Sequence, residues 1–206
     1  FGLAELYAKP YSAGNLTTNL GLQLVTSPTV NGQVTSANLV PRSSVQDTYA
    51  QILADLTTAK PLLNDEIGVF ASKYAAAAIL SRVYLQMGDY AKARDEANEV
   101  IENSGASLTT TYVGAFNNAD PSSEDIFVLP VTAQDGTNDM WLFWSTGDYG
   151  ARDGDVEVNQ EHLDLYDPAD QRLALFWDVD DIYYSGKYRY QYRFLSQVRL
   201  AEMILT

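Results

Sequence analysis

The sequence predicts a mostly α-helical fold, in which tight helical hairpins support an irregular, loop-rich region that carries short strands. Three observations predict it. Apolar residues recur at helical spacing between residues 44 and 105. Small residues stand at the contact positions of the last two helices in this range. Beyond Gly105 the helical period stops, and Gly, Asp, Asn and aromatic residues become frequent.

The first 41 residues contribute little regular structure to this prediction. Residues 1–11 read as the end of a helix that Pro10 stops. Residues 12–41 are rich in Gly, Asn, Thr and Ser and show no sustained period, which predicts a long surface loop. A short extended piece is expected at residues 23–26.

Three helices follow. The first covers residues 45–63, with Ser44 as its N-cap. The second runs over 72–87, and the third over 90–102 after a tight turn. Gly105 suits the left-handed position just after a helix end.

The second half is predicted from shorter signals. Residues 124–131 have strand composition, and Asn159 can cap a short helix. Asp167, before a proline, resembles a further helix start. Alternating tyrosines around Ser185 and Gly186 predict a β-hairpin, and the last eight residues return to a helix.

No internal boundary divides the chain, so we expect one domain over residues 1–206. It has a helical repeat core at about 44–105 and a loop-rich region at about 106–198. With 206 residues, of which 46% are hydrophobic, the chain is long enough to bury a core.

Charge and composition exclude several kinds of partner. The formal charge is −14, from 27 acidic and 13 basic residues. Because phosphate backbones and anionic lipids attract positive surfaces, we expect no nucleic-acid partner and no electrostatic membrane binding. The absence of cysteine excludes disulfides and thiolate metal sites. We expect no metal and no cofactor.

The spacing of small residues in the second hairpin matches a tetratricopeptide repeat unit. Ala93 and Ala97 stand where small residues let two antiparallel helices approach closely, and Ser81 holds a position where glycine is common. A generic tight hairpin gives the same spacing by chance, so this alternative stays open. Such repeats present surfaces to partners and are rarely catalytic.

Several segments, taken in order, resemble the SusD/RagB family of surface glycan-binding lipoproteins of Bacteroidetes. They are "LGLQLVT", "RSSVQDTYAQILADLTTAKPLL", "ASKYAAAAILSRVYLQMGDYAKARDEANEVIENSGASLTTTYVGAFNN", "SSEDIFVLPV", the Asp170-x-Arg172 pair and "VRLAEMIL". The similarity spans nearly the whole chain. The middle block is the most specific part, because spacing and neighbouring residues agree over about 90 residues.

The resemblance implies a non-enzymatic protein that binds oligosaccharide or polysaccharide for nutrient uptake. It implies an outer-membrane location facing outward, through a lipid anchor that would lie outside this segment. It also implies a partner, a SusC-like TonB-dependent transporter. Compared with a full family member, the sequence lacks the leading lipobox Cys, the first helices and the C-terminal part, and reads as a fragment.

Candidate sugar ligands are concentrated in "GTNDMWLFWSTGDYGARDGD", because aromatic faces pack on sugar CH groups and planar polar groups bind hydroxyls. The candidates are Trp141, Trp144, Tyr149, Asn138, Asp139 and Arg152, with Asp153 beside them. The alternative is that Trp141, Phe143 and Trp144 only anchor the loop. Alternation would place Trp141 and Phe143 on one side and Trp144 on the other, giving the two tryptophans different roles.

A second candidate surface is formed by the tyrosines of "YYSGKYRYQYRF", for which a purely structural role is the alternative. An acidic loop could bind calcium through its oxygen ligands, but its spacing does not match the helix-loop-helix motif, and a solvated acidic loop is the alternative. Its residues are Asp148, Asp153, Asp155 and Glu157.

Catalytic signals are weak. Carboxylates that can pair for glycoside cleavage are Glu157, Glu161 and Asp164, or Asp178, Asp180 and Asp181. With 27 acids in the chain, such pairs are expected by chance. His162 is the only histidine, which excludes a multi-histidine metal site. Two other functions stay open: a tetratricopeptide-type protein-interaction scaffold without sugar binding, and a glycoside hydrolase fragment.

Overall fold

The computed structural model describes residues 1–30, 32–152 and 155–206. Its helices are α1 (Gly2–Tyr7), α2 (Val45–Ala59), α3 (Lys73–Met87), α4 (Tyr90–Asn103), α5 (Asp139–Trp144), α6 (Gln160–Leu163) and α7 (Leu200–Leu205). Its strands are β1 (Leu20–Gln23), β2 (Arg42–Ser44), β3 (Asp125–Pro130), β4 (Phe176–Val179), β5 (Ile182–Ser185) and β6 (Phe194–Arg199). The mostly helical prediction is confirmed. Within these ranges, each helix is too short or too polar to cross a membrane.

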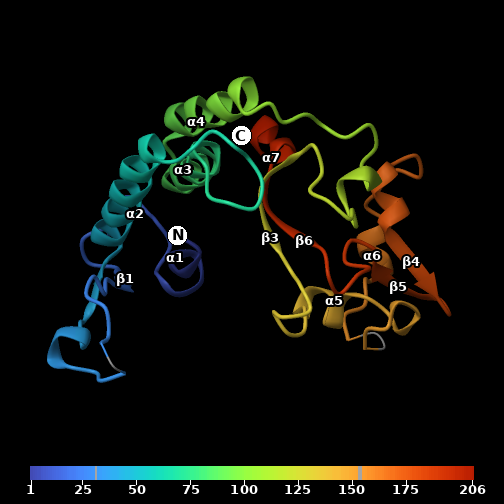
Figure 1. The fold of residues 1–206 in the computed structure, drawn as a ribbon, viewed down its shortest axis with the longest axis horizontal. Coiled ribbons are helices and arrows are strands. Elements are labelled where there is room, and N and C mark those ends of the chain that lie inside the picture. Colours follow the sequence, from blue (N-terminus) through green and yellow to red (C-terminus); the bar gives the residue numbers. More distant parts are fainter. Residues whose placement is uncertain (31, 153–154) are drawn as a thin grey trace.

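Helices α2, α3 and α4 form an arch at one end of the molecule (Figure 1). The expected caps are present, because the Ser44 hydroxyl accepts a hydrogen bond from the Asp47 amide (3.0 Å) and the Ser72 hydroxyl accepts one from the Ala75 amide (3.2 Å). Gly88 ends α3 in the left-handed region, with φ at 77°.

The α3–α4 hairpin is as tight as its small residues predict. Ala93 and Ala97 are 0% and 2% exposed. The buried Ser81 hydroxyl donates a hydrogen bond to the Ala93 carbonyl across the hairpin, at 2.9 Å. Ser81 is therefore small enough for the close contact and also links the two helices.

One core cluster joins the arch to the end of the chain. Ala77 and Val100 from the hairpin pack with Ile126 of β3, Val198 of β6 and Met203 of α7. This packing seats α7 against α4, so the C-terminus lies beside the arch (Figure 1). A second cluster packs α1 against α2 and α3.

The strands form three two-stranded antiparallel sheets: β1 with β2, β3 with β6, and β4 with β5. The β3–β6 pair runs from α7 toward α5, where the loop-rich region with α6, β4 and β5 lies (Figure 1). It therefore connects the helical arch to the region that carries the predicted ligand residues.

The predicted hairpin at Ser185–Gly186 is wrong. The hairpin turn lies at Asp180 and Asp181, which join β4 to β5 with φ values of 54° and 65°. Positive φ at both central residues is the geometry of a type I′ turn, which Asp tolerates. Gly186 has another role, because a Cβ there would lie 2.6 Å from the Trp177 ring.

Three further expectations need correction. The segment at 139–144, expected to be loop, is the helix α5. No helix starts at Asp167; Asp170 instead caps a 3-10 helix, Gln171–Leu175. Asn159 precedes α6 but makes no side-chain cap hydrogen bond.

Candidate functional site

Asn138 and Trp141 hold α5 in place. The buried Asn138 caps the helix through its Oδ1, which accepts from the amides of Met140 (3.1 Å) and Trp141 (3.4 Å). Its Nδ2 donates to the Gln191 carbonyl at 3.1 Å. Trp141 is 8% exposed, and its Nε1 donates to the Tyr149 carbonyl at 3.2 Å. Both side chains are thus engaged inside the protein.

Trp144 differs from Trp141 in its exposure, which is 38%. The alternation expected for an extended segment is wrong, because these residues are helical and Trp144 follows Trp141 at i+3. The two tryptophans nevertheless differ, since Trp141 faces the interior and Trp144 faces solvent.

The predicted charged residues lie at the exposed edge of the same region. Asp139 is exposed in the first turn of α5. Arg152 forms an ion pair with Asp155 at 2.9 Å, and its guanidinium lies 5.5 Å from the centre of the Phe143 ring. Asp153 lies outside the described residues.

Tyr149 contacts Trp177, a tryptophan that the sequence pattern did not place near it. Its ring stacks on that of Trp177 in β4, with centroids 4.5 Å apart and an interplanar angle of 27°. We call this pair the Tyr149–Trp177 stack. Tyr149 remains 38% exposed, so an aromatic surface faces solvent. The Arg189 guanidinium lies 4.2 Å from the centre of the Trp177 ring.

A cavity of about 270 Å³ opens at the stack, and we call it the stack cavity. It is lined by Thr146, Asp148, Tyr149, Phe176, Trp177, Asp178 and Val179. The Thr146 Oγ1 is buried and has no hydrogen-bond partner among the described residues. Asp178 Oδ1 accepts from the Asp181 amide at 2.9 Å, which fixes the position of this carboxylate beside the cavity.

Asn117 positions the segment that carries Arg189. Its backbone is in the left-handed region, with φ at 61°. Its Nδ2 donates to the Gly186 carbonyl and its Oδ1 accepts from the Arg189 amide, both at 2.8 Å. These two bonds hold residues 186–189 next to Trp177.

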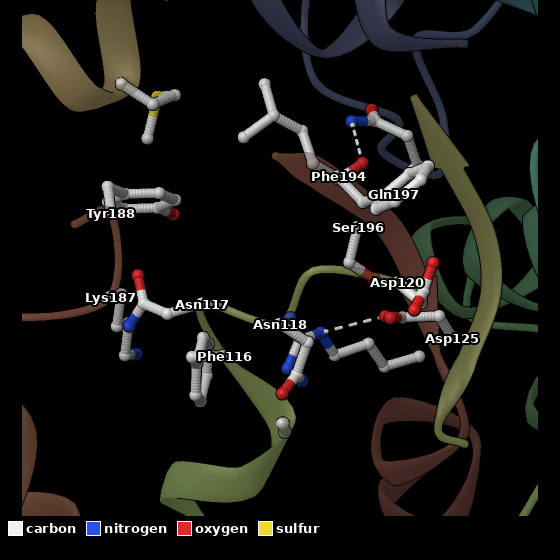
Figure 2. A pocket seen from close by; sticks show the side chains of 14 residues that line it. Phe116, Asn117, Asn118, Asp120, Asp125, Lys187, Tyr188, Phe194, Ser196 and Gln197 are labelled. Carbon is white, nitrogen blue, oxygen red and sulfur yellow. Dashed lines mark hydrogen bonds and ion pairs between the residues drawn. The ribbon is translucent and has the colours of Figure 1, made fainter. Parts of the chain in front are cut away.

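A second cavity, of about 250 Å³, is lined by Asn117 and by the other residues shown in Figure 2. Asp125 and Arg199 form an ion pair in its wall, with Asp125 Oδ1 3.5 Å from Arg199 Nε. Both cations of this wall contact Phe116: the distances to the ring centre are 4.3 Å for Arg199 and 5.2 Å for Lys187.

Several of the carboxylates considered for catalysis have local structural roles. Asp180 and Asp181 form the hairpin turn, and Asp164 accepts a hydrogen bond from Gln160 at 2.8 Å. His162 is exposed, and its Nε2 lies 3.1 Å from the Tyr166 hydroxyl. Across residues 1–30, 32–152 and 155–206, there is no group of three or more His, Cys, Asp or Glu that could hold a metal.

The Asp170-x-Arg172 pair shapes the turn before β4. The Arg172 side chain binds the Asp170 carboxylate, and this hydrogen bond holds the pKa of Asp170 below its ordinary value. The Arg172 guanidinium also lies 4.6 Å from the centre of the Tyr166 ring. The pair therefore orients the chain as it enters the strand that carries Trp177.

Comparison with known proteins agrees with this architecture. A family model described as "Starch-binding associating with outer membrane" matches residues 1–85. No curated protein matches the chain.

Solved structures match over nearly the whole chain. A SusD superfamily protein from Bacteroides thetaiotaomicron VPI-5482 has a TM-score of 0.79 and 25% identity, covering 100% of this chain and 50% of that one. One from Bacteroides vulgatus ATCC 8482 has a TM-score of 0.78 and 26% identity, covering 96% and 48%. A SusD-like carbohydrate binding protein from the same organism has a TM-score of 0.71 and 20% identity, covering 90% and 43%.

The chain thus spans about half the length of the SusD superfamily structures that it matches. The helical arch, the β3–β6 pair and the loop-rich region all fall within the matched range, since the match covers the whole chain. Fold and sequence together make the chain similar to SusD superfamily proteins.

Proposed function

We propose that this protein binds an oligosaccharide or polysaccharide non-covalently at the Tyr149–Trp177 stack. The observation that supports it is an aromatic pair, exposed at Tyr149 and half-buried at Trp177, beside a cavity with polar walls. Aromatic faces pack against the CH surfaces of sugars, while carboxylates and hydroxyls bind the sugar hydroxyl groups.

The residues that line the stack cavity have different roles in the proposed binding. Tyr149 and Trp177 provide the stacking surface, and Asp148 and Asp178 accept hydrogen bonds from hydroxyls. Of the two tryptophans predicted as sugar ligands, Trp144 is the one whose side chain is exposed.

The proposed cellular role rests on the proteins to which this chain is similar. The family model names starch binding and association with the outer membrane, and one structural relative is named a carbohydrate binding protein. We propose that the protein acts at the cell surface, without catalysis, and hands its glycan to a TonB-dependent transporter of the SusC type. Copurification of a large outer-membrane β-barrel with the protein would support this partner.

Calorimetry against a panel of polysaccharides that includes starch and laminarin tests the binding proposal. Replacing Tyr149 with alanine removes one face of the stack, and we expect the affinity to fall roughly 2- to 10-fold, the equivalent of an aromatic contact. Tyr90→Ala is the control, because Tyr90 is also an exposed tyrosine (70%) but lies in α4, outside the stack cavity. Equal losses in both variants, or turnover of the glycan by the pure protein, would contradict the proposal.

A further inference from the structure

The positive charge of this acidic protein is concentrated next to the stack. Residues 182–201 contain Lys187, Arg189, Arg193 and Arg199 and no acidic residue, in a chain whose formal charge is −14. We call residues 187–193, which hold three of these cations, the basic segment. Of its three cations, Arg189 lies at the proposed sugar site, over the Trp177 ring.

The cations of the basic segment are not neutralised by described residues. Elsewhere, ion pairs with carboxylates are formed by Lys60, Lys73, Arg82, Lys92, Arg94, Arg152 and Arg172, whereas none is found for Lys9 and Arg42 among the described residues. In the described part of the chain, no carboxylate lies within 4.0 Å of the charged atoms of Lys187, Arg189 or Arg193. The Nε atoms of Arg189 and Arg193 are buried, and within the described ranges they also lack a hydrogen-bond partner.

Aromatic rings hold these charges in place instead. Lys187 lies over Phe116 (5.2 Å), Arg189 over Trp177 (4.2 Å) and Arg193 over Tyr190 (4.1 Å). A ring face orients a cation without cancelling its charge. The Arg189 guanidinium has no carboxylate partner among the described residues, so its terminal nitrogens can form a charge-assisted hydrogen bond to an anion, which is among the stronger polar contacts in proteins.

We infer that the glycan is acidic, with a carboxylate or sulfate on its sugar units. This inference rests on the proposed function and names its substrate class. A sugar on the Tyr149–Trp177 stack places its anionic group at Arg189 and its hydroxyls at Asp148 and Asp178. The two aspartates repel an anion, so they favour this orientation over the reverse one.

The basic segment also favours a ligand with repeated charges. Lys187 is two residues from Arg189, so their backbones are at most about 7 Å apart. Their charged groups lie over different rings, Phe116 and Trp177, so successive anionic units of one polysaccharide would each meet a different cation.

Calorimetry with four polysaccharides tests the inference. Polygalacturonate carries carboxylates, chondroitin sulfate carries both carboxylates and sulfates, and starch and laminarin are neutral. We expect an acidic polysaccharide to bind more tightly than either neutral one, with an affinity that falls as ionic strength rises. Comparison of the first two shows whether sulfate contributes beyond the carboxylate.

Arg189→Gln should weaken binding of the acidic polysaccharide about tenfold, the equivalent of one hydrogen bond to a charged group. Arg94→Gln is the control, because it removes the same charge from the exposed face of α4. If Arg189→Gln lowers the melting temperature, its effect on binding cannot be separated from its effect on folding. Lys187→Gln, which leaves the contact of Arg189 with the Trp177 ring intact, then serves as the second variant in which binding is measured.

Binding of starch or laminarin alone, without salt dependence, would overturn the inference and leave the proposed function standing. Equal weakening by Arg94→Gln would also overturn it, because the effect would then be one of net charge. If no polysaccharide binds, the proposed function fails as well.

Discussion

The helical arch and the loop-rich region are stabilised by contacts of different range. In the arch, a residue packs against neighbours that helical periodicity places beside it, as Ala93 and Ala97 do within one hairpin. In the loop-rich region, single side chains bind backbone far away in sequence, as Asn138 binds Gln191 and Asn117 binds Gly186. The first kind of contact leaves a periodic pattern in the sequence, and the second kind does not.

The largest effect on stability is expected in the arch. Ala93→Leu inserts a larger side chain where Ala93 is fully buried against α3, and should lower the free energy of unfolding by about 1–3 kcal/mol. Urea denaturation measures this loss. Ala91→Leu, at an exposed position of the same helix, should change stability by less than about 0.5 kcal/mol. A similar loss in both variants would show that the hairpin is not closely packed at Ala93.

In the loop-rich region, Gly186→Ala should damage the site more than the fold. The added Cβ would lie 2.6 Å from the Trp177 ring, so the half-buried ring has to move. We expect about 1 kcal/mol of destabilisation and a change in tryptophan fluorescence, together with weaker glycan binding. Gly2→Ala is the control, since a Cβ at Gly2 has nothing within 4 Å. Unchanged fluorescence and binding in Gly186→Ala would argue against a rigid stack.

The smallest effect concerns Lys60, which joins the end of α2 to α4 through Glu96 (2.6 Å) and Glu99 (2.5 Å). Burial works to lower the pKa of Lys60, but the hydrogen bonds to these two carboxylates outweigh it and the pKa is raised. Lys60→Gln should cost roughly 0.5–1 kcal/mol at neutral pH.

The sign of the pH dependence follows from the raised pKa. The stabilisation by Lys60 is fully present below the pKa of the unfolded chain and is lost as pH rises through the higher pKa of the folded state. The difference in urea midpoint between the protein and Lys60→Gln should therefore shrink at strongly alkaline pH. A difference that persists there would assign the effect to packing of the Lys60 stem.

The different range of the contacts in the two regions explains which parts of the fold could be predicted from the sequence. The helices α2, α3 and α4 and their caps were predictable, because Ser44, Ser72 and Gly88 act on amides and carbonyls a few residues away. The strand β3 was also predictable from its composition, although its partner β6 was not. Pairing across about 70 residues leaves no local signal.

The candidate site could be predicted only in part. The aromatic composition of the loop region was enough to predict Tyr149 and the exposed Trp144 as candidate ligands. Trp177 was missed, because it lies 28 residues beyond Tyr149 in the sequence and meets it only through the β4–β5 hairpin. That hairpin was placed at the wrong turn, because Asp180 and Asp181 adopt positive φ without a glycine. Asn138 and Trp141 were predicted as sugar ligands because they are polar and aromatic. In the structure their hydrogen bonds hold α5 in place instead.

A crystal structure with a bound oligosaccharide from whichever polysaccharide binds most tightly tests the central claim most directly. The account predicts a sugar ring stacked on Tyr149 and Trp177, with its hydroxyls at Asp148 and Asp178. A sugar seated instead on the exposed tyrosines Tyr190 and Tyr192, with the stack cavity empty, would contradict it.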